Sequence, residues 1–180
     1  MEERERQAIV AALDDKLAQR GSWCGETHLQ KAVFFLQELF DVQTGFRFIF
    51  YKYGPFSRDL RGELSTMRGD GFLEVVPSPP YGPKLMLTQP AREQLIERHA
   101  NAIRPYDGPL GFVAERLASL GVGDLERLAA ALWVHRRLSE ASEDKQAARI
   151  NELKPHVSVD SARQALRDVA EMERAARAAV

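Results

Sequence analysis

With 180 residues, the chain is long enough for one domain that buries a hydrophobic core without disulfides or a structural metal. Its net charge of −1 excludes a global electrostatic field that attracts nucleic acid or membranes, but it does not exclude a local basic face. The single cysteine, Cys24, excludes an internal disulfide, and the N-terminus has no apolar signal core, so we expect a cytoplasmic protein with no membrane partner.

Two helices open the chain. Residues 2–19 carry aliphatic side chains every four positions among charged ones, which predicts an amphipathic helix that ends before Gly21. A second helix begins at Glu26 or Thr27 and reaches Phe40. Its apolar residues cover a wide face, so we expect it to be largely buried.

A strand and a third helix follow. Residues 46–51, FRFIFY, are aromatic and β-branched, which predicts a strand. The pair Gly54-Pro55 should break this strand, and Ser57 is a suitable N-cap for the next helix. The inward-facing stripe of that helix is expected to consist of Phe56, Leu60, Leu64 and Met67. The following RGDG sequence ends the helix.

A hairpin with a long loop comes next. Residues 72–76 and 84–88 predict two short strands around PSPPYGP, residues 77–83. This loop is too long and too rich in proline for a tight turn, so it should project from the body. Pro90 then opens a helix that reaches about residue 101. The element order so far is that of a winged helix-turn-helix with a small β-hairpin wing.

The remainder of the chain has no strand signal and is rich in Ala, Leu and Arg. Helices are predicted at 109–120, 124–138, 142–153 and 159–178. Asp124 is expected to cap the second of these, Ser158 or Asp160 to start the last, and Trp133 to help fill the helical core. The fold class is therefore mainly α (α+β).

The predicted organisation has two parts. Residues 1–104 form the winged-helix-like unit, and residues 105–180 form a C-terminal helical bundle that packs on it, unless the two constitute one domain.

The third helix has the features of a DNA recognition helix. The residues that would contact DNA share one helix face or adjoin the wing loop: Arg58, Arg61, Ser65, Arg68 and Lys84. Arginine on an exposed helix can grip phosphate or read guanine. Asp59, Glu63 and Asp70 flank this face, however, and leave only a weak excess of positive charge.

The polar residues form no recognisable catalytic, cofactor or metal site. The histidines are scattered, whereas a zinc site needs several ligands that converge on one point. No base is held beside Cys24, which we interpret as a small semi-buried residue. The GVGD sequence lacks the lysine and hydroxyl of a P-loop. We therefore expect no catalytic residues, no cofactor, no metal and no enzymatic activity.

Several aromatic and arginine side chains predict a surface for a protein partner, because such residues dominate interface hot spots. They are Trp23, Tyr51, Tyr53, Arg58, Arg61 and Tyr81. Core packing competes with this interpretation, and the sequence favours a core position for at least two of Tyr51, Tyr53, Phe56 and Tyr81.

Three segments together resemble one protein family. GETHLQKAVFFLQ resembles the Gly-x-Thr-x-Leu-Gln-Lys helix of the YwgA-like and SocA-like proteins, also called the Panacea antitoxin domain. YKYGPFSRDLRGELSTMRGDGFLEV is similar to their Tyr-Gly-Pro-Tyr-Ser segment, the helix after it and its Glu-containing ending. LERLAAALWV and ELKPHVSVDSARQAL resemble the later helices, so the resemblance spans about residues 25–170. Phe56 stands where tyrosine is common, and His28 stands where Lys or Arg is expected.

The resemblance implies a compact, mainly helical domain that acts by binding. Members of the family neutralise toxins, deliver partners to proteases, or occur in prophage and phage-defence loci. No catalytic residues carry over. We therefore expect a non-enzymatic antitoxin- or adaptor-like module whose partner is a toxin or effector protein. The alternative is a sequence-specific DNA-binding regulator of the winged-helix type, acting as a homodimer.

Overall fold

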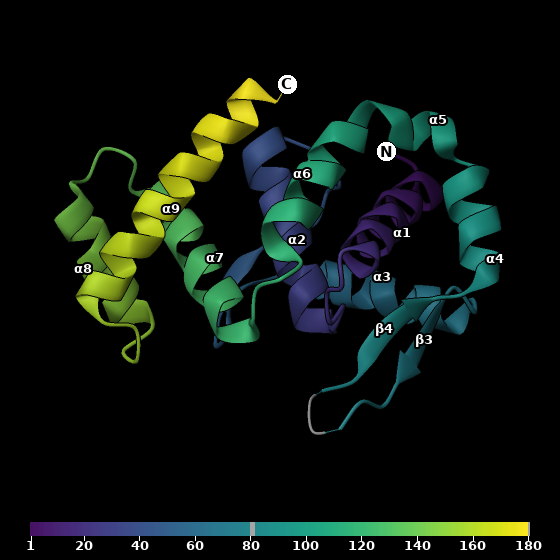
Figure 1. The fold of residues 1–180 in the computed structure, drawn as a ribbon, viewed down its shortest axis with the longest axis horizontal. Coiled ribbons are helices and arrows are strands. Elements are labelled where there is room, and N and C mark those ends of the chain that lie inside the picture. Colours follow the sequence, from purple (N-terminus) through teal and green to yellow (C-terminus); the bar gives the residue numbers. More distant parts are fainter. Residues whose placement is uncertain (80–81, 180) are drawn as a thin grey trace.

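The computed structural model describes residues 1–79 and 82–179, and this part of the chain is mainly helical with two short antiparallel hairpins (Figure 1). In chain order the elements are α1 (Glu3–Gln19), α2 (Glu26–Phe40), β1 (Ile49–Tyr51), β2 (Gly54–Phe56), α3 (Arg58–Gly69), β3 (Leu73–Val76), β4 (Lys84–Leu87), α4 (Gln89–Ala91), the π-helical turn η1 (Arg92–Glu97), α5 (Ala100–Ile103), the 3₁₀ turn η2 (Arg104–Tyr106), α6 (Asp107–Leu117), α7 (Val122–Arg137), α8 (Glu143–Leu153) and α9 (Val159–Ala178).

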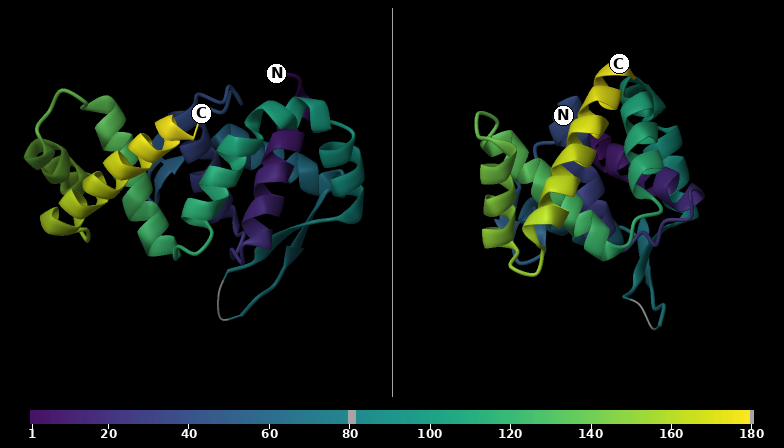
Figure 2. Two further views of the ribbon diagram at one scale, coloured as in Figure 1. Left: turned by 45° about the horizontal axis from the view of Figure 1, so that its top comes forward. Right: turned by 60° about the vertical axis from the view of Figure 1, so that its left-hand side comes forward.

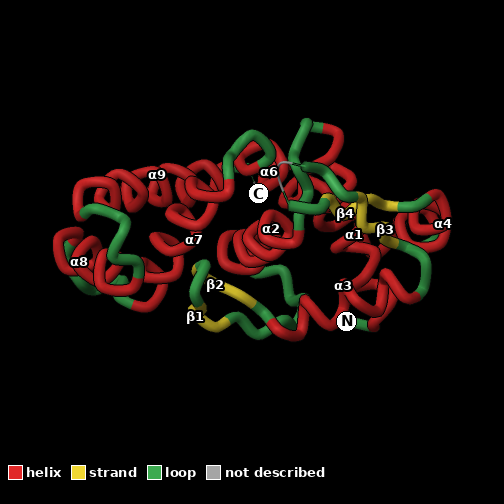
Figure 3. The backbone as a smooth tube through the Cα atoms, turned by 90° about the horizontal axis from the view of Figure 1, so that it is seen from below, coloured by secondary structure: helices red, strands yellow, loops and turns green. Residues whose placement is uncertain are grey.

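Helix α2 is the centre of the packing. It contacts α1, α6, α7 and β2, and Figure 3 shows it between α1 and α7. The prediction that this helix is largely buried is confirmed, because its stretch from His28 to Leu36 is buried without interruption. The Phe34 ring lies 5.3 Å from the ring of Phe48 and 6.0 Å from that of Trp133, so Trp133 packs against the core but is only partly buried.

The C-terminal helices pack directly on the N-terminal ones. α6 lies against both α1 and α2, α7 lies against α2 and β2, and α9 crosses α7 and α8 (Figure 2). One continuous cluster of buried apolar side chains includes residues from both sides of position 104. The division at residue 104 stays a prediction. The chain passes that point through consecutive helical turns, α5, η2 and α6.

The first hairpin differs from the sequence prediction. The strand expected at 46–51 is limited to β1, and Gly54-Pro55 is not a break but part of a second strand, with Phe50 opposite Pro55 and Tyr51 opposite Gly54. Proline is tolerated here because an edge strand need not donate at every position. Phe56 therefore belongs to β2 and is only half buried, so its expected place in the inward stripe of α3 was wrong.

The second hairpin agrees with the prediction. Strands β3 and β4 pair antiparallel, with Leu73 opposite Leu87 and Val76 opposite Lys84, and they extend away from the helices (Figure 1). Strand β4 is attached to the α1–α2 loop, because the Leu85 amide donates to the Cys24 carbonyl at 2.8 Å. The second hairpin is thus held by a segment that lies far before it in the chain.

Helix ends follow local chemistry, with two corrections. Residues 102–108, which lie between the helices predicted to end at about 101 and to begin at 109, are helical as well, because Pro105 and Pro109 fall in first turns, where proline costs no hydrogen bond. α7 begins after Gly121, so Asp124 is in the first turn and not the cap. Ser158 starts α9, since its hydroxyl accepts from the Ser161 amide.

Among the helices of the described residues, none combines the length and the apolar character that a membrane crossing requires.

The carboxyl group of Asp14 is buried without full compensation. Asp14 of α1 is 1% exposed, and its Oδ1 atom has no hydrogen-bond partner among the described residues. Burial is the main cause that raises the pKa of Asp14 to about 7 from an ordinary value of 3.8, and the nearby Cys24 thiol partly opposes it. Between these two values the folded state binds more protons than the unfolded state, so this group makes stability fall as pH rises toward 7.

We expect Asp14→Asn to stabilise the protein more at pH 8 than at pH 5, because the amide cannot ionise. The two gains in the free energy of unfolding should differ by on the order of 2 kcal/mol. Urea denaturation at both pH values measures this difference, with Glu140→Gln, an exposed position, as control. Equal gains at pH 5 and pH 8 would show that Asp14 is not protonated in the fold.

Candidate functional site

Two polar residues of α2 hold the first hairpin and the start of α3. The Gln30 side chain donates from Nε2 to the Ser57 carbonyl and accepts from the Ser57 amide at Oε1, both at 2.9 Å. Its neighbour Lys31 donates from Nζ to the Pro55 carbonyl at 3.0 Å. Both side chains are buried, where an amide and an ammonium need such partners. The Leu-Gln-Lys and Tyr-Gly-Pro-Phe-Ser segments therefore meet in space.

Local interactions and backbone geometry explain how the chain passes from the first hairpin into α3. Ser57 has extended backbone angles, and its hydroxyl accepts from the Leu60 amide, so the expected N-cap is confirmed. Gly54 has a φ of +90°, which favours glycine. A Cβ there would lie 3.6 Å from the Glu126 carbonyl of α7 and 3.9 Å from Cε of Lys31, so the hairpin rests closely on both helices.

A cluster of buried charges lies beneath the hairpin. Lys154, which follows α8, pairs with Glu126 of α7 at 2.8 Å between Nζ and Oε2, and both residues are almost inaccessible to solvent. Lys31 is 2% exposed. Burial is the main cause that lowers the pKa of Lys31 to about 8, Glu126 opposes this and Lys154 adds to it. The cluster contains two lysines and one carboxylate.

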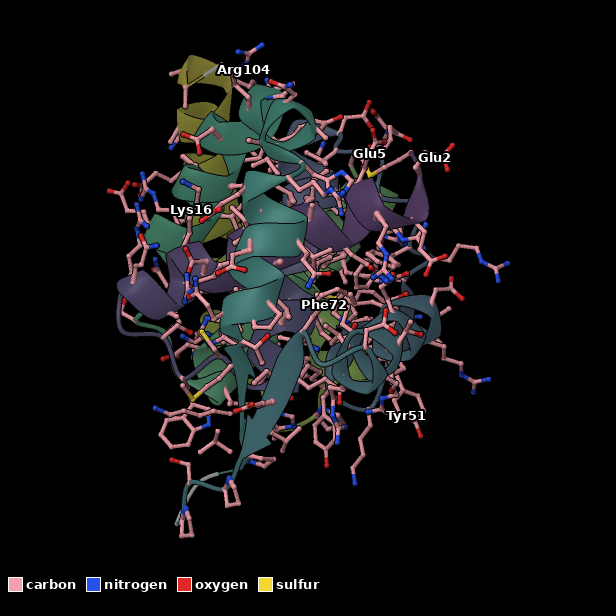
Figure 4. All side chains as sticks on the ribbon, turned by 90° about the vertical axis from the view of Figure 1, so that its right-hand side faces the viewer. Glu2, Glu5, Lys16, Tyr51, Phe72 and Arg104 are labelled. Atoms are coloured by element: carbon pink, nitrogen blue, oxygen red, sulfur yellow. The ribbon has the colours of Figure 1, made fainter. Side chains whose placement is uncertain are left out.

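The hairpin presents its outer side chains to solvent as the tyrosine surface, which we define as Ile49, Tyr51, Tyr53, Phe56, Arg58 and Arg61. Ile49, Tyr51 and Tyr53 are 47%, 59% and 54% exposed. Figure 4 shows Tyr51 at the outer margin of the molecule. The sequence favoured core positions for at least two of the aromatic residues, but Tyr51 and Tyr53 are exposed and Phe56 is half buried. Tyr81 lies outside the described residues.

Two hollows adjoin the tyrosine surface. The first, of about 440 Å³, is lined by Ile49, Tyr51, Phe56, Arg58, Arg61 and Gly62. The second, of about 200 Å³, which we call the recess, is lined by Glu26, Thr27, Gln30, Lys31, Tyr51, Tyr53, Phe56 and Arg61. The guanidinium of Arg61 lies 4.7 Å above the Phe56 ring, and its Nε donates to Glu26 Oε1 at 2.8 Å. The structure thus brings Tyr51, Tyr53, Arg58 and Arg61 together on one surface.

Trp23 lies at a separate hollow of about 650 Å³. The lining includes Gly82 and Pro83 from the loop between β3 and β4 and Val122 at the start of α7. The indole Nε1 of Trp23 donates to the Gly82 carbonyl at 3.0 Å, and the Lys84 ammonium lies 4.6 Å above its ring. Glu26 and Thr27 line both this hollow and the recess, so the two sites flank the N-terminus of α2.

The arginines of α3 lie on an exposed face, as the sequence indicates. Arg58, Ser65 and Arg68 are exposed, and within the described ranges neither Arg58 nor Arg68 forms an ion pair. The flanking carboxylates have partners elsewhere. Glu63 accepts from Arg6 of α1, Asp70 from Arg4 of α1, and Asp59 from Arg47. The acidic groups therefore neutralise arginines outside α3, which the sequence alone did not indicate.

The loop before α2 has a structural role. Cys24 is fully buried at 3% exposure, more than the semi-buried position expected, and burial raises the pKa of its thiol to about 12. His28 is buried as well. Its Nε2 donates to the Leu117 carbonyl at 2.9 Å and Ser22 lies at its other nitrogen, so it presents no basic surface. In the part of the chain described here, no group of three or more His, Cys, Asp or Glu side chains is arranged to hold a metal ion.

Sequence reasoning missed Gln30, Lys31, Ile49 and the Glu126–Lys154 pair. A signal for the first two was present, because they interrupt an apolar run on a helix expected to be buried. Nothing in the sequence pattern links Lys154 to Glu126, which lie 28 residues apart.

No family model matches the chain, and no curated protein matches it. The resemblance to the YwgA-like and SocA-like proteins therefore remains a hypothesis.

We expect Gly54→Ala to lower the free energy of unfolding by about 1–2 kcal/mol, because an L side chain is strained at φ +90°. Gly62→Ala is the matched control. It lies in α3, where an added methyl group would meet open space, and it should raise stability by about 0.5–1 kcal/mol. Urea denaturation of both variants measures the contrast. A Gly54→Ala protein as stable as the wild type would exclude a conformational requirement at this turn.

Proposed function

We propose that this protein is a non-enzymatic protein-binding module, antitoxin- or adaptor-like, and that the tyrosine surface binds its partner. The observation that carries the proposal is the exposure of Ile49, Tyr51 and Tyr53 side by side, with Arg58 and Arg61 at their edge. Tyrosine and arginine are the residue types that most often dominate binding energy at protein interfaces.

The anchoring of the hairpin supports this proposal. Gln30 and Lys31 fix the backbone of residues 55–57 from below, so the exposed rings are carried on an ordered support. A preorganised surface loses less conformational entropy on binding than a mobile loop. The two hollows next to the rings would each accept a side chain of the partner.

The family resemblance supports the antitoxin version of this proposal. Its two most specific segments, the Leu-Gln-Lys helix and Tyr-Gly-Pro-Phe-Ser, are the ones that contact each other through Gln30 and Lys31. In this proposal the partner is a toxin or effector, the protein works in the cytoplasm, and it belongs to a toxin–antitoxin, prophage or phage-defence locus.

In the same proposal α1, α2 and α3 with the β3–β4 wing correspond to a winged-helix-like unit, and α6 to α9 to its C-terminal bundle. One departure is clear, since residues 41–57 with their own hairpin separate α2 from α3, where a helix-turn-helix has a turn of about three or four residues.

A photo-crosslinking amino acid at position 53 tests the proposed interface. Placed there in the host cells, it should form a covalent adduct with one protein, while the same group at Glu152, an exposed position of α8, should not. Mass spectrometry identifies the adduct. The double variant Tyr51→Ala/Tyr53→Ala should weaken binding of that protein about 100-fold, as loss of hot-spot residues does.

If the captured protein inhibits growth, co-expression with the wild type should restore growth and co-expression with the double variant should not. Identical adducts from positions 53 and 152, or undiminished binding by the double variant, would place the interface elsewhere.

Binding of DNA by α3 is the second candidate function, and the ion pairs of its acidic residues favour it. Because Asp59, Glu63 and Asp70 are engaged by arginines outside α3, they offset Arg58 and Arg68 less than the sequence suggests. Lys84 would act from the wing, and a homodimer would read two half-sites.

For this candidate, Arg58→Ala/Arg68→Ala should reduce affinity for the DNA upstream of the protein's own gene. It should also lower the slope of log affinity against log salt by about 2, since each arginine that contacts a phosphate contributes about 0.9. Fluorescence anisotropy across a salt series measures both quantities, with Arg149→Ala on α8 as control. Absence of binding by the wild type at low salt would exclude this function.

A further inference from the structure

The residues around the tyrosine surface carry an excess of positive charge. Lys31, Arg58 and Arg61 line the two hollows, and Glu26 is the single carboxylate among the lining residues of both. Lys52 adds a further ammonium 5.3 Å above the Tyr53 ring. The surface as a whole is therefore complementary to a negatively charged ligand.

The buried charges beneath the recess have the same imbalance. Lys31 and Lys154 share Glu126 as their carboxylate, and Lys31 reaches the wall of the recess. The Lys31 ammonium donates one hydrogen bond to the Pro55 carbonyl, but this neutral group supplies no counter-charge. A buried ammonium without a full counter-charge is costly, and a nearby anion offsets that cost more strongly than it would in water.

The ion pair between Glu26 and Arg61 indicates how such an anion is accommodated. The two side chains are 41% and 61% exposed, and exposed pairs of this kind contribute little to stability. A carboxylate that arrives in the recess can therefore replace Glu26 as the partner of Arg61 at low cost. Glu26 occupies the position that a ligand carboxylate would take.

We propose that the tyrosine surface recognises an acidic segment of its protein partner, with one Asp or Glu carboxylate in the recess beside Arg61 and over Lys31, and an adjacent apolar side chain against Tyr51 and Tyr53. This inference rests on the proposed function and specifies the chemistry of its partner. Lys31 acts through its charge, in addition to holding the hairpin.

The test separates these two roles of Lys31. Lys31→Met keeps the length of the side chain and removes the charge. Gln30→Leu removes the two hydrogen bonds to Ser57 without changing any charge, and so loosens the same hairpin. Circular dichroism and thermal unfolding establish that each variant is folded.

The ligands are peptides selected from a randomised displayed library for binding to the wild type and not to Tyr53→Ala. We expect Asp and Glu to be enriched at least twofold over the starting library. A synthetic copy of a selected peptide should bind Lys31→Met at least tenfold more weakly than the wild type. Its counterpart with Asn and Gln in place of Asp and Glu should lose clearly less affinity for Lys31→Met, because it loses only the effect of the hydrogen bond to Pro55 on the hairpin. Gln30→Leu should weaken both peptides by the same factor.

Four results would overturn the inference. Peptides that require Tyr53 but lack acidic enrichment, or that bind Lys31→Met as well as wild type, would refute the acidic partner while leaving the protein-binding function in place. If Lys31→Met weakened binding of the acidic and the neutral peptide by the same factor, Lys31 would have a structural role only. A library that yields no Tyr53-dependent peptide would refute both the inference and the proposed function.

Discussion

The reciprocal hydrogen bonds between the Gln30 side chain and the Ser57 backbone are the interaction on which the rest of the candidate site depends. They attach the end of the first hairpin to the most deeply buried helix, and Lys31 adds a bond one residue further along. Because both polar groups are buried, leaving either one unpaired would cost more than the bond itself contributes. The position of Tyr51, Tyr53, Arg58 and Arg61 follows from this attachment.

The long helices could be predicted from the sequence because their apolar periodicity and their caps agree. Residues 159–178 are an example, with Ser158 before them and a buried stripe along the helix. Strand β2 could not be predicted, because the Gly54-Pro55 sequence is typical of a turn. These residues form a strand only because they pair with β1. The cap of α7 could not be predicted either, because Asp124 is an ordinary cap residue but Gly121 takes the cap position and the helix begins at Val122.

The candidate site could be predicted only in its exposed half. Aromatic and arginine residues that local folding did not explain pointed to Tyr51, Tyr53, Arg58 and Arg61, and the structure places all four on one surface. The buried half depends on tertiary contacts. A lysine within a helix is usually solvent-exposed, and Lys31 is buried because the hairpin covers it and offers the Pro55 carbonyl.

The apolar character of β1 explains why polar groups must fix the hairpin. Its residues Ile49, Phe50 and Tyr51 are apolar on both faces, yet Phe50 packs on the Trp133 ring at 5.8 Å while its two neighbours are exposed. A shift of one residue would bury Ile49 and Tyr51 in exchange for exposing Phe50, so it would bury no less apolar surface than the observed register does. Hydrophobic burial alone therefore does not choose the register. The bonds from Gln30 and Lys31 fix residues 55–57 on α2, and β1 pairs with β2 in the register that leaves Tyr51 in solvent.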